Sequence, residues 1–183
     1  MALILASASP RRRELLAMIR PDFQVITSEF DESALPPCAP KTTAERLAEG
    51  KCRAVAAQHP DDTVIGSDTV VEFDGQVFGK PKDKEDARRM LRALSGADHY
   101  VHTGVSIWHD GSCHTFSATT RVRFYPISEE QIEAYISTEE PYDKAGGYAI
   151  QGTAALFCEE IEGDYYTIMG FPVSRVARAL AAL

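Results

Sequence analysis

Serine, proline and arginine residues follow directly after a short apolar run near the start of the chain. The run comprises residues 2–6, and the polar segment reads Ser7-Ala-Ser-Pro-Arg-Arg-Arg. The apolar residues predict a buried strand, Ser9 is a typical N-cap residue, and Pro10 suits the first helical position. The first N–H groups of a helix are unpaired, and its dipole favours negative charge there. Because hydroxyl and guanidinium groups also bind phosphate oxygens, this segment predicts a phosphate site that includes Ser7 and Ser9.

The three arginines of this segment differ in their expected directions. On a helical wheel Arg12 falls between Leu16 and Ile19, on the inner face of the helix. Arg13 points away from that face, and Arg11 lies at its edge. Arginine is poorly placed at a helix N-terminus because the dipole repels it. A bound anion removes this conflict, which favours the phosphate hypothesis over a solvated basic turn.

A lysine and an aspartate stand in apolar surroundings, where each needs a partner. Lys51 lies in the middle of the apolar stripe of an expected helix over residues 43–58. It must snorkel outward, meet a buried carboxylate or face a cleft, and snorkelling is as plausible as a functional role. Asp68 lies in a mostly apolar strand over residues 63–73, so its carboxylate needs a cation, a metal or several donors. A bond to a neighbouring turn is the structural alternative, but a role in a site is favoured.

Four further polar residues are weak indications of a site when each is taken alone. Glu32 is a candidate second carboxylate, although alone it resembles ordinary loop acidity. Lys80 could meet a phosphate, although a solvated lysine loop is the more common case. Lys144 and Gln151 flank a glycine pair in the expected loop 139–153, where glycine permits close backbone approach and glutamine can recognise a base edge.

Composition limits the classes of protein that fit. The chain has 183 residues, 44% of them hydrophobic, which suits a single domain over 1–183 or two small lobes that share a core. A formal net charge of −8 argues against a nucleic-acid partner. No apolar run is long enough to span a membrane, and the N-terminal run is too short for a signal peptide. Four cysteines without metal-ligand spacing favour a reducing, cytoplasmic compartment. Walker A, serine-elbow and dinucleotide fingerprints are absent from the sequence.

Hydrophobic periodicity predicts alternating strands and helices. The expected strands are 2–6, 23–27, 63–73, 76–79, 99–109, 113–124, 154–161 and 165–169. The expected helices are 10–18, 43–58, 83–94, 128–137 and 171–183. Asp74-Gly75 and Asp110-Gly111 are strong hairpin turns. The pattern therefore predicts an α/β protein with a mixed sheet.

Several segments taken together resemble the Maf family of nucleotide pyrophosphatases across essentially the whole chain. They are Leu5-Ala-Ser-Ala-Ser-Pro-Arg-Arg-Arg-Glu-Leu-Leu, Gly66-Ser-Asp-Thr-Val-Val, Gly79-Lys-Pro-Lys-Asp, Ser95-Gly with His102-Thr-Gly-Val, and Glu140-Pro-Tyr-Asp-Lys-Ala-Gly-Gly-Tyr-Ala-Ile-Gln-Gly. The resemblance implies a twisted mixed sheet flanked by helices, in two lobes with a central cleft, similar to the inosine-triphosphate pyrophosphatases. It also implies hydrolysis of nucleoside triphosphates between the α- and β-phosphates with Mg²⁺ or Mn²⁺.

The resemblance also assigns expected roles to individual residues. The catalytic group would be Asp68, Lys51, Lys80 and Glu32, with Asp68 and Glu32 as metal ligands. The substrate-binding group would be Ser7, Ser9, Arg11, Arg12, Thr69, Gln151 and Lys144. Members similar to dTTP/UTP pyrophosphatases carry the residues that stand here as Arg11, Thr69 and Gln151, whereas members acting on 7-methyl-GTP tend to carry an aromatic residue, His and Glu. The chain therefore resembles the pyrimidine type, with dTTP and UTP as expected substrates and CTP and modified pyrimidine nucleotides as further candidates.

The sequence leaves several alternatives open. Asp68 could orient or deprotonate the attacking water, or hold the metal. A non-catalytic nucleotide-binding regulator linked to septum formation is the alternative from another class, and it predicts affinity without hydrolysis. A phosphatase that releases orthophosphate is a further alternative. A homodimer is compatible with the sequence, which does not determine the oligomeric state.

Overall fold

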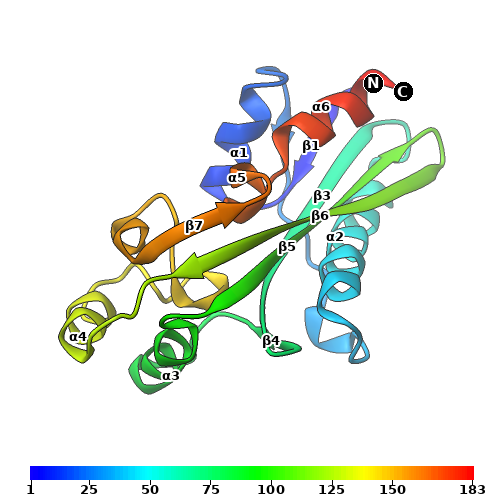
Figure 1. Ribbon diagram of the computed structural model, residues 1–183. Helices are drawn as coiled ribbons and strands as arrows, with labels where there is room; N and C mark the ends of the chain where they lie inside the picture. Colours follow the sequence, from blue (N-terminus) through cyan, green and yellow to red (C-terminus); the bar gives the residue numbers. More distant parts are fainter.

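The computed structural model describes residues 1–183 and is built on one twisted, seven-stranded mixed sheet (Figure 1). The strands are β1 (Leu3–Ala6), β2 (Gln24–Val25), β3 (Thr63–Phe73), β4 (Gln76–Phe78), β5 (Asp98–His109), β6 (Ser112–Phe124) and β7 (Cys158–Glu162). Their order in the sheet is β2-β1-β3-β5-β6-β7, and β4 pairs with β3 beside this path. β1 is parallel to both β2 and β3, and all other pairs are antiparallel. The expected α/β class and mixed sheet are confirmed.

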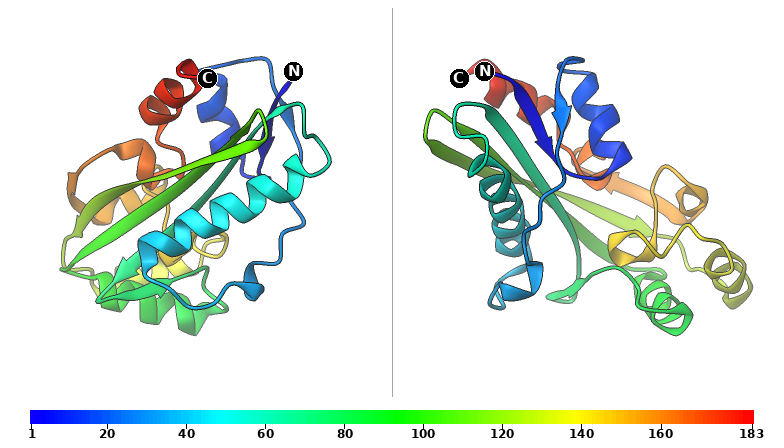
Figure 2. Two further views of the ribbon diagram at one scale, coloured as in Figure 1. Left: turned by 90° about the vertical axis from the view of Figure 1, so that its right-hand side faces the viewer. Right: turned by 180° about the vertical axis from the view of Figure 1, so that it is seen from behind.

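Helices flank the sheet on both sides. They are α1 (Pro10–Ala17), α2 (Pro40–Ala56), α3 (Lys84–Leu94), α4 (Glu129–Ile136), α5 (Tyr165–Ile168) and α6 (Val173–Ala181). The single-turn elements are η1 (Glu32–Ala34), η2 (Ala145–Gly147) and η3 (Thr153–Phe157). Helix α2 covers one face, whereas α1, α5 and α6 lie on the other (Figure 2). No helix is long and apolar enough to cross a membrane.

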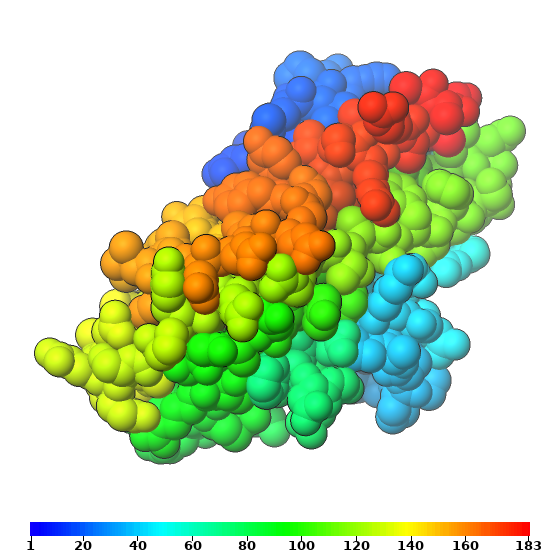
Figure 3. Space-filling model, viewed as in Figure 1, coloured from blue at the N-terminus to red at the C-terminus, as the bar shows by residue number.

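Apolar side chains gather in separate cores toward the two ends of the long strands. The largest core packs α3 and α4 against the ends of β5 and β6. A second core joins α1 and α6 across β1, β3 and β5, and a third lies under α2. In the space-filling view the α1 and α6 segments share one end of the molecule, while the α4 segment lies at the other (Figure 3). The molecule therefore has two lobes, and β3 runs through both.

Several expected elements differ from the structure, among them the strand expected over residues 23–27, which is shortened to Gln24–Val25. Residues 165–169 were expected to form a strand but form the helix α5, because Asp164 caps it by accepting hydrogen bonds from Tyr166 N and the Thr167 hydroxyl. The expected strand 154–161 is divided into η3 and β7, and only the second part pairs with β6. Helix α2 begins at Pro40 rather than at residue 43, since proline is tolerated in the first turn.

Two glycines let the backbone of α2 rest directly on the sheet. A Cβ atom at Gly66 on β3 would lie 2.3 Å from the Ala48 carbonyl oxygen, and one at Gly104 on β5 would lie 2.2 Å from the Ala44 carbonyl oxygen. Real side chains do not approach backbone this closely, so any larger residue must displace the helix. The two positions thus fix the height of α2 above β3 and β5.

We predict that Gly104→Ala destabilises the fold by about 1–3 kcal/mol, because the added methyl group overpacks the interface between α2 and the sheet. The free energy of urea unfolding measures this loss. Gly79→Ala is the matched control, since nothing lies within 4 Å of a Cβ atom at that position. Unfolding of Gly104→Ala at the wild-type denaturant midpoint would show that α2 does not depend on this contact.

Candidate functional site

The turn between β1 and α1 arranges two serine hydroxyls at the helix N-terminus. Ser9 is the N-cap residue, and its Oγ accepts a hydrogen bond from Arg12 N at 3.4 Å. Ser7 is buried, and its Oγ accepts from Ser9 N at 3.2 Å and from Arg12 Nη1 at 3.4 Å. A hydroxyl has two acceptor lone pairs and one hydrogen. Ser7 therefore keeps its hydrogen free to donate to an anion.

Arg12 connects three parts of the chain. Its Nε donates to the Gly170 carbonyl at 2.9 Å, Nη2 donates to Thr69 Oγ1 at 3.1 Å, and Nη1 reaches Ser7. These contacts use three of the five guanidinium N–H groups, so two remain for a ligand. Burial lowers the pKa of Arg12 and the charge of Asp68 opposes that shift, but an arginine stays protonated. The inward direction expected from the helical wheel agrees with this placement.

Lys51 lies between two carboxylates. Its Nζ is 2.5 Å from Asp68 Oδ1 and 2.8 Å from Glu32 Oε1. The side chains of Lys51 and Asp68 are 17% and 13% exposed, whereas Glu32, on η1, is 56% exposed. The lysine that interrupts the apolar stripe of α2 therefore pairs with the strand aspartate rather than snorkelling into solvent. The pair therefore places a cation and an anion in a partly buried space, next to the more exposed carboxylate of Glu32.

Strand β3 connects the contact of Lys51 with Asp68 to the contact of Arg12 with Thr69. Asp68 and Thr69 are consecutive, so their side chains point to opposite faces of the sheet. Asp68 contacts Lys51 of α2 on one face, and Thr69 contacts Arg12 of α1 on the other. The charges of Asp68 and Glu32 both raise the pKa of Arg12, against the larger effect of its burial. The carboxylates of Asp68 and Glu32 are therefore close enough to Arg12 for an electrostatic interaction.

The loop 139–153 brings further predicted residues to the same region. Lys144 pairs with Asp143. Burial alone would raise the pKa of Asp143, but the hydrogen bond and charge of Lys144, together with the charge of Arg11, hold that pKa below its ordinary value. Asp143 of the loop therefore interacts electrostatically with Arg11 at the start of α1.

Four predicted site residues make no side-chain hydrogen bond or ion pair with another predicted site residue: Arg11, Lys80, Lys144 and Gln151. Lys80 is exposed, and its loop is tied to η2 because Gly146 N donates to the Gly79 carbonyl at 3.0 Å. Gln151 is also exposed. The side chains of Lys80 and Gln151 are held by no hydrogen bond or ion pair within the protein.

The loop 139–153 is fastened at its two ends by one carboxylate. Glu140 accepts hydrogen bonds from the Tyr135 hydroxyl at 2.9 Å and from Thr153 N at 3.1 Å. Partial burial favours its neutral form, but these hydrogen bonds hold the pKa of Glu140 below its ordinary value. In addition the Tyr135 oxygen accepts from Ala149 N at 3.2 Å. These hydrogen bonds therefore join the two ends of the loop that carries Lys144 and Gln151, and attach its Ala149 to α4.

A buried histidine supports the middle of this loop. His99 is fully buried, and its Nε2 lies 2.8 Å from the Tyr148 hydroxyl. Its Nδ1 has no hydrogen-bond partner. Burial lowers the pKa of His99 to about 4, so the ring is neutral in the folded protein near pH 7.

Sequence patterns missed three groups that the structure places around Arg12. Ser67 Oγ lies 2.9 Å from the Gly104 carbonyl oxygen and 3.0 Å from that of Gly170, so its single hydrogen is shared between them, and the Thr103 hydroxyl lies 2.9 Å from that of Thr69. Ser67 and Thr103 are small polar residues at fully buried strand positions, and this polarity within an apolar strand was an available signal. The carbonyl of Gly170 has no such signal, since any residue carries one.

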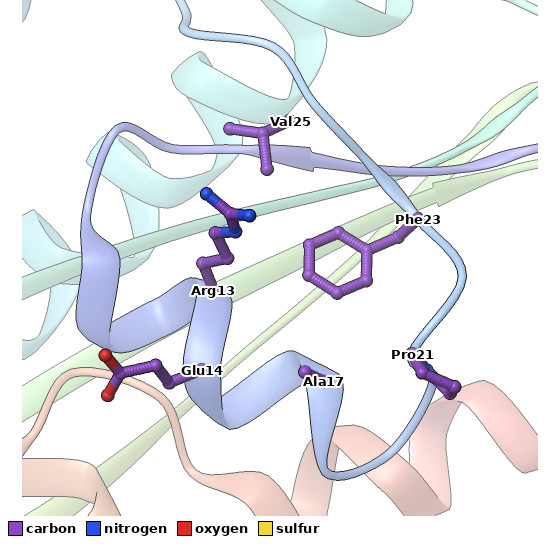
Figure 4. Close-up of a pocket in the computed structure, with 6 residues that line it drawn as sticks. All are labelled: Arg13, Glu14, Ala17, Pro21, Phe23 and Val25. Atoms are coloured by element: carbon purple, nitrogen blue, oxygen red, sulfur yellow. The ribbon is translucent and has the colours of Figure 1, made fainter.

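Two hollows lie on the outer side of α1, and one of them adjoins the serine turn. One of about 380 Å³ is lined partly by Ser7, Ser9 and Arg13. The other, of about 500 Å³, lies between α1 and β2, with Arg13 and Phe23 pointing into it (Figure 4). Arg13 itself is exposed, as the helical wheel predicted, and faces away from Arg12 and Asp68.

The structure contains no group of three or more His, Cys, Asp or Glu side chains that could hold a metal ion. Asp68 and Glu32, the expected metal ligands, converge on the same lysine nitrogen. A protein that binds Mg²⁺ with a phosphorylated substrate needs only one or two carboxylates, because phosphate and water oxygens complete the coordination. The two carboxylates are compatible with that arrangement.

Residues 2–183 match the family described as Maf-like protein. The chain belongs to this family. Among the similar curated Maf relatives, a dTTP/UTP pyrophosphatase of Bacillus velezensis is 48% identical over 97% of this chain and 94% of its own length. A protein of the same name from Halalkalibacterium halodurans is 46% identical over 97% of this chain and 94% of its own length. Another from a Geobacillus species is 46% identical over 99% of this chain and 97% of its own length.

Solved structures confirm the fold of this Maf chain. A Ham1 protein from Coxiella burnetii matches it with a TM-score of 0.56 and 14% identity, covering 100% of each chain. The Ham1 protein of Staphylococcus aureus matches with a TM-score of 0.53 and 15% identity, covering 100% of this chain and 99% of its own. At this level of identity the likeness establishes the arrangement of strands and helices.

We predict that the chain loses stability on acidification between pH 6.5 and 4 in part through His99. In the unfolded chain this histidine binds a proton below about pH 6.5, whereas in the folded protein it stays neutral down to about pH 4. The unfolded state therefore binds more protons across this window, and His99 lowers the free energy of unfolding by on the order of 3 kcal/mol as the pH falls.

Urea unfolding of wild type and His99→Phe at pH 7, 6, 5 and 4 measures this contribution. The phenylalanine variant is expected to lose less stability on acidification, whatever its stability at pH 7. The exposed His114, changed to Gln, is the control and should retain the wild-type slope. An identical pH slope in all three proteins would contradict the prediction.

Proposed function

We propose that this chain hydrolyses dTTP and UTP between the α- and β-phosphates to give the monophosphate and pyrophosphate. The observation that carries the proposal is the Lys51–Asp68 pair, whose carboxylate is close enough to Arg12 for its charge to raise the pKa of that arginine against the larger effect of burial. An anion site next to a cation-bound carboxylate suits phosphoryl transfer, where catalysis rests on positioning and charge stabilisation. The names of the curated relatives favour the same substrates.

The phosphate-binding group in this proposal lies at the start of α1. Ser7 and Ser9 donate hydroxyl hydrogens, and Arg11 and Arg12 bind the triphosphate oxygens. Lys144 adds positive charge from the late loop, and Lys80 approaches from the loop after β4. Their combined charge stabilises the negative charge that develops on the leaving pyrophosphate.

The catalytic group in this proposal is the ion-paired cluster. Asp68 orients the attacking water and accepts its proton as the oxygen–phosphorus bond forms, while the bond to the pyrophosphate oxygen breaks. Lys51 holds the carboxylate in place, and the cluster of Lys51, Asp68 and Glu32 carries one net negative charge. Gln151 has a free side-chain amide that suits the edge of a pyrimidine base. CTP and modified pyrimidine nucleotides are further candidate substrates.

Asp68 and Glu32 would hold a Mg²⁺ or Mn²⁺ ion together with phosphate oxygens. When bound, such an ion supplies charge neutralisation at the phosphates. In this arrangement Lys51 must release one carboxylate oxygen or share it, which the exposed position of Glu32 permits.

We also propose that residues 1–183 act as a single catalytic domain in the cytoplasm, where nucleoside triphosphates are made and used. Its partner is the small-molecule nucleotide, without a nucleic acid or a membrane. The four free cysteines are consistent with a reducing compartment.

Product analysis tests the reaction. We expect purified protein with Mg²⁺ to convert dTTP and UTP faster than CTP, dGTP or 7-methyl-GTP, and ion-exchange chromatography to resolve monophosphate and pyrophosphate in equal amounts. Orthophosphate as the first product would identify a phosphatase instead. Nucleotide binding without any product would favour the non-catalytic regulator.

We expect Asp68→Asn to lower kcat by at least about 100-fold while nucleotide affinity changes far less, because the amide cannot accept a proton from water. Glu32 still pairs with Lys51 in this variant, so the cation does not lose all its partners. Glu49→Gln is the matched control, since Glu49 pairs with Arg53 on the outer side of α2. A turnover rate of Asp68→Asn equal to that of the control would remove Asp68 from the mechanism.

Removal of divalent ions should stop turnover. EDTA is expected to abolish product formation, and added Mg²⁺ or Mn²⁺ is expected to restore it, since two carboxylates and substrate phosphates are suitable oxygen ligands. Glu32→Gln should raise the metal concentration required for half-maximal activity. Full activity in EDTA would show that the lysine and arginine side chains stabilise the triphosphate without a metal ion.

A further inference from the structure

We propose that the outer side of α1 carries a second nucleoside subsite, which takes the far end of a dinucleoside polyphosphate. The substrate class is two uridines joined through a chain of four phosphates. In this subsite Arg13 binds the distal phosphates, and the ring of Phe23 stacks on the distal base. The inference rests on the proposed function, in which the turn of Ser7 and Ser9 binds phosphate.

The two hollows beside α1 form one groove that leads away from the serine turn. The smaller hollow, of about 380 Å³, includes Ser7 and Ser9 in its walls, and the larger one includes Phe23. Arg13 and Glu14 line both hollows, so the two adjoin. A phosphate chain that extends from the serine turn therefore passes Arg13 before it reaches Phe23. The larger hollow, of about 500 Å³, is of the size that binds small molecules.

Ser7 gives the groove a buried donor at its inner end. Its side chain belongs to a residue that is only 7% exposed, and its Oγ accepts hydrogen bonds from Ser9 N and Arg12 Nη1. The single hydroxyl hydrogen has no acceptor within the protein. Because Ser7 lines the smaller hollow, a phosphate oxygen there can accept this hydrogen.

Arg13 supplies a positive charge that the fold does not use. The residue is exposed, and its side chain forms no ion pair or hydrogen bond within the protein. Figure 4 shows its guanidinium in the space between α1 and β2, on the side of Val25 and Phe23. The helix dipole disfavours a cation in the first turn, and a bound phosphate offsets this repulsion. The planar guanidinium also matches two phosphate oxygens at once.

Phe23 provides a surface for a base. One side of the residue packs against the core that joins α1 and α6, and it is only partly buried. Its ring points into the larger hollow together with Arg13 (Figure 4). An aromatic ring beside a cationic groove is the arrangement that holds a nucleobase next to its phosphates. The pair therefore suits a nucleoside that follows a phosphate chain.

Glu14 favours a nucleoside over a longer phosphate chain. Its carboxylate lines both hollows, is exposed and forms no ion pair within the protein. In Figure 4 it points away from Arg13 and Phe23, so it does not occupy the guanidinium. A carboxylate repels further phosphates but accepts hydrogen bonds from the hydroxyl groups of a ribose.

The reaction on such a substrate is the proposed cleavage with a larger leaving group. Water attacks the α-phosphorus of the first uridine, and Asp68 accepts its proton. The bond from that phosphorus to the oxygen that bridges to the β-phosphate breaks, and its electron pair stays on the bridging oxygen. Diuridine tetraphosphate and water thus give UMP and UTP, with the second uridine of the UTP product in the groove.

Three ligands isolate the contribution of the second uridine. Values of kcat/KM are measured with Mg²⁺ for UTP, uridine tetraphosphate and diuridine tetraphosphate, and the last two differ only in the second nucleoside. We expect wild-type protein to cleave diuridine tetraphosphate with about 10-fold higher kcat/KM than uridine tetraphosphate, as for one base stacked on an aromatic ring. Chromatography should show UMP and UTP as its first products.

Two variants test the residues of the groove. Phe23→Leu keeps an apolar side chain for the core and should reduce the advantage of the second uridine to about 2-fold or less, with UTP hydrolysis unchanged. Arg13→Gln should lower kcat/KM for diuridine tetraphosphate by about 10-fold and for UTP by at most about 3-fold. Arg20→Gln is the matched control, since Arg20 is an exposed arginine outside both hollows. Its values for all three ligands should equal those of wild type.

A binding measurement accompanies the kinetics. Titration calorimetry in the Asp68→Asn protein, where turnover is slow, gives the Kd of uridine tetraphosphate and of diuridine tetraphosphate. The second uridine should lower Kd by about 5- to 10-fold, and the added change Phe23→Leu should abolish this gain. Urea unfolding confirms that each variant is folded.

The outcomes separate this inference from the proposed function. Equal kcat/KM and equal Kd for the two tetraphosphates in the presence of Phe23 would overturn the subsite. Equal losses on all three ligands in Arg13→Gln would also overturn it, because Arg13 would then act on the triphosphate alone. Two molecules of UDP as the products of diuridine tetraphosphate would overturn the cleavage position. If wild-type protein hydrolyses none of the ligands, the proposed function fails, and the difference in Kd still decides whether the second uridine is bound.

Discussion

The close contact between α2 and the sheet is the constraint on which the candidate site depends. Gly66 and Gly104 present no side chain toward α2, and the helix carbonyls of Ala48 and Ala44 occupy the space that Cβ atoms would fill. At this distance Lys51, one residue before the buried Cys52, reaches Asp68 with a 2.5 Å contact. If side chains at these two positions pushed the helix away from the sheet, Lys51 would extend into solvent. The partly buried carboxylate of Asp68 would then lack this cation.

Arg12 performs a comparable role on the opposite face. Its side chain reaches Ser7 at the start of the chain, Thr69 in the central strand and Gly170 near the end. A guanidinium suits such a junction because it offers several donors in one rigid plane and stays charged when partly buried. Asp68 and Thr69 are neighbours on β3. This single step along the strand connects the contact with Lys51 of α2 to the contact with Arg12 of α1. The two faces of the sheet thus contribute to a single charged region.

The loop 139–153 is attached to the core by buried polar side chains. Glu140 accepts hydrogen bonds from Tyr135 and from the backbone of Thr153, and the Tyr148 hydroxyl lies within hydrogen-bond distance of the buried His99. Burial raises the pKa of Tyr148 and lowers that of His99, so both rings stay neutral and their hydrogen bond needs no charge. These hydrogen bonds tie the loop to the core of the protein. They leave Gln151 at the surface with its amide free.

The sequence by itself determined the main strands, the helices α1 and α3 and the two hairpins, because hydrophobic period, N-caps and Asp-Gly turns are local signals. It also marked Lys51 and Asp68, since a charge within an apolar pattern needs a partner wherever it folds. It failed at residues 165–169, where the side chain of Asp164 outweighed an apolar pattern and made a helix. Only the tertiary structure decided that Lys51 and Asp68 are each other's partners, that Thr69 contacts Arg12, and that the carbonyl of Gly170 supports that arginine. Those pairings join residues far apart in the chain, and periodicity carries no information about which distant groups the packing of α2 and α5 brings together.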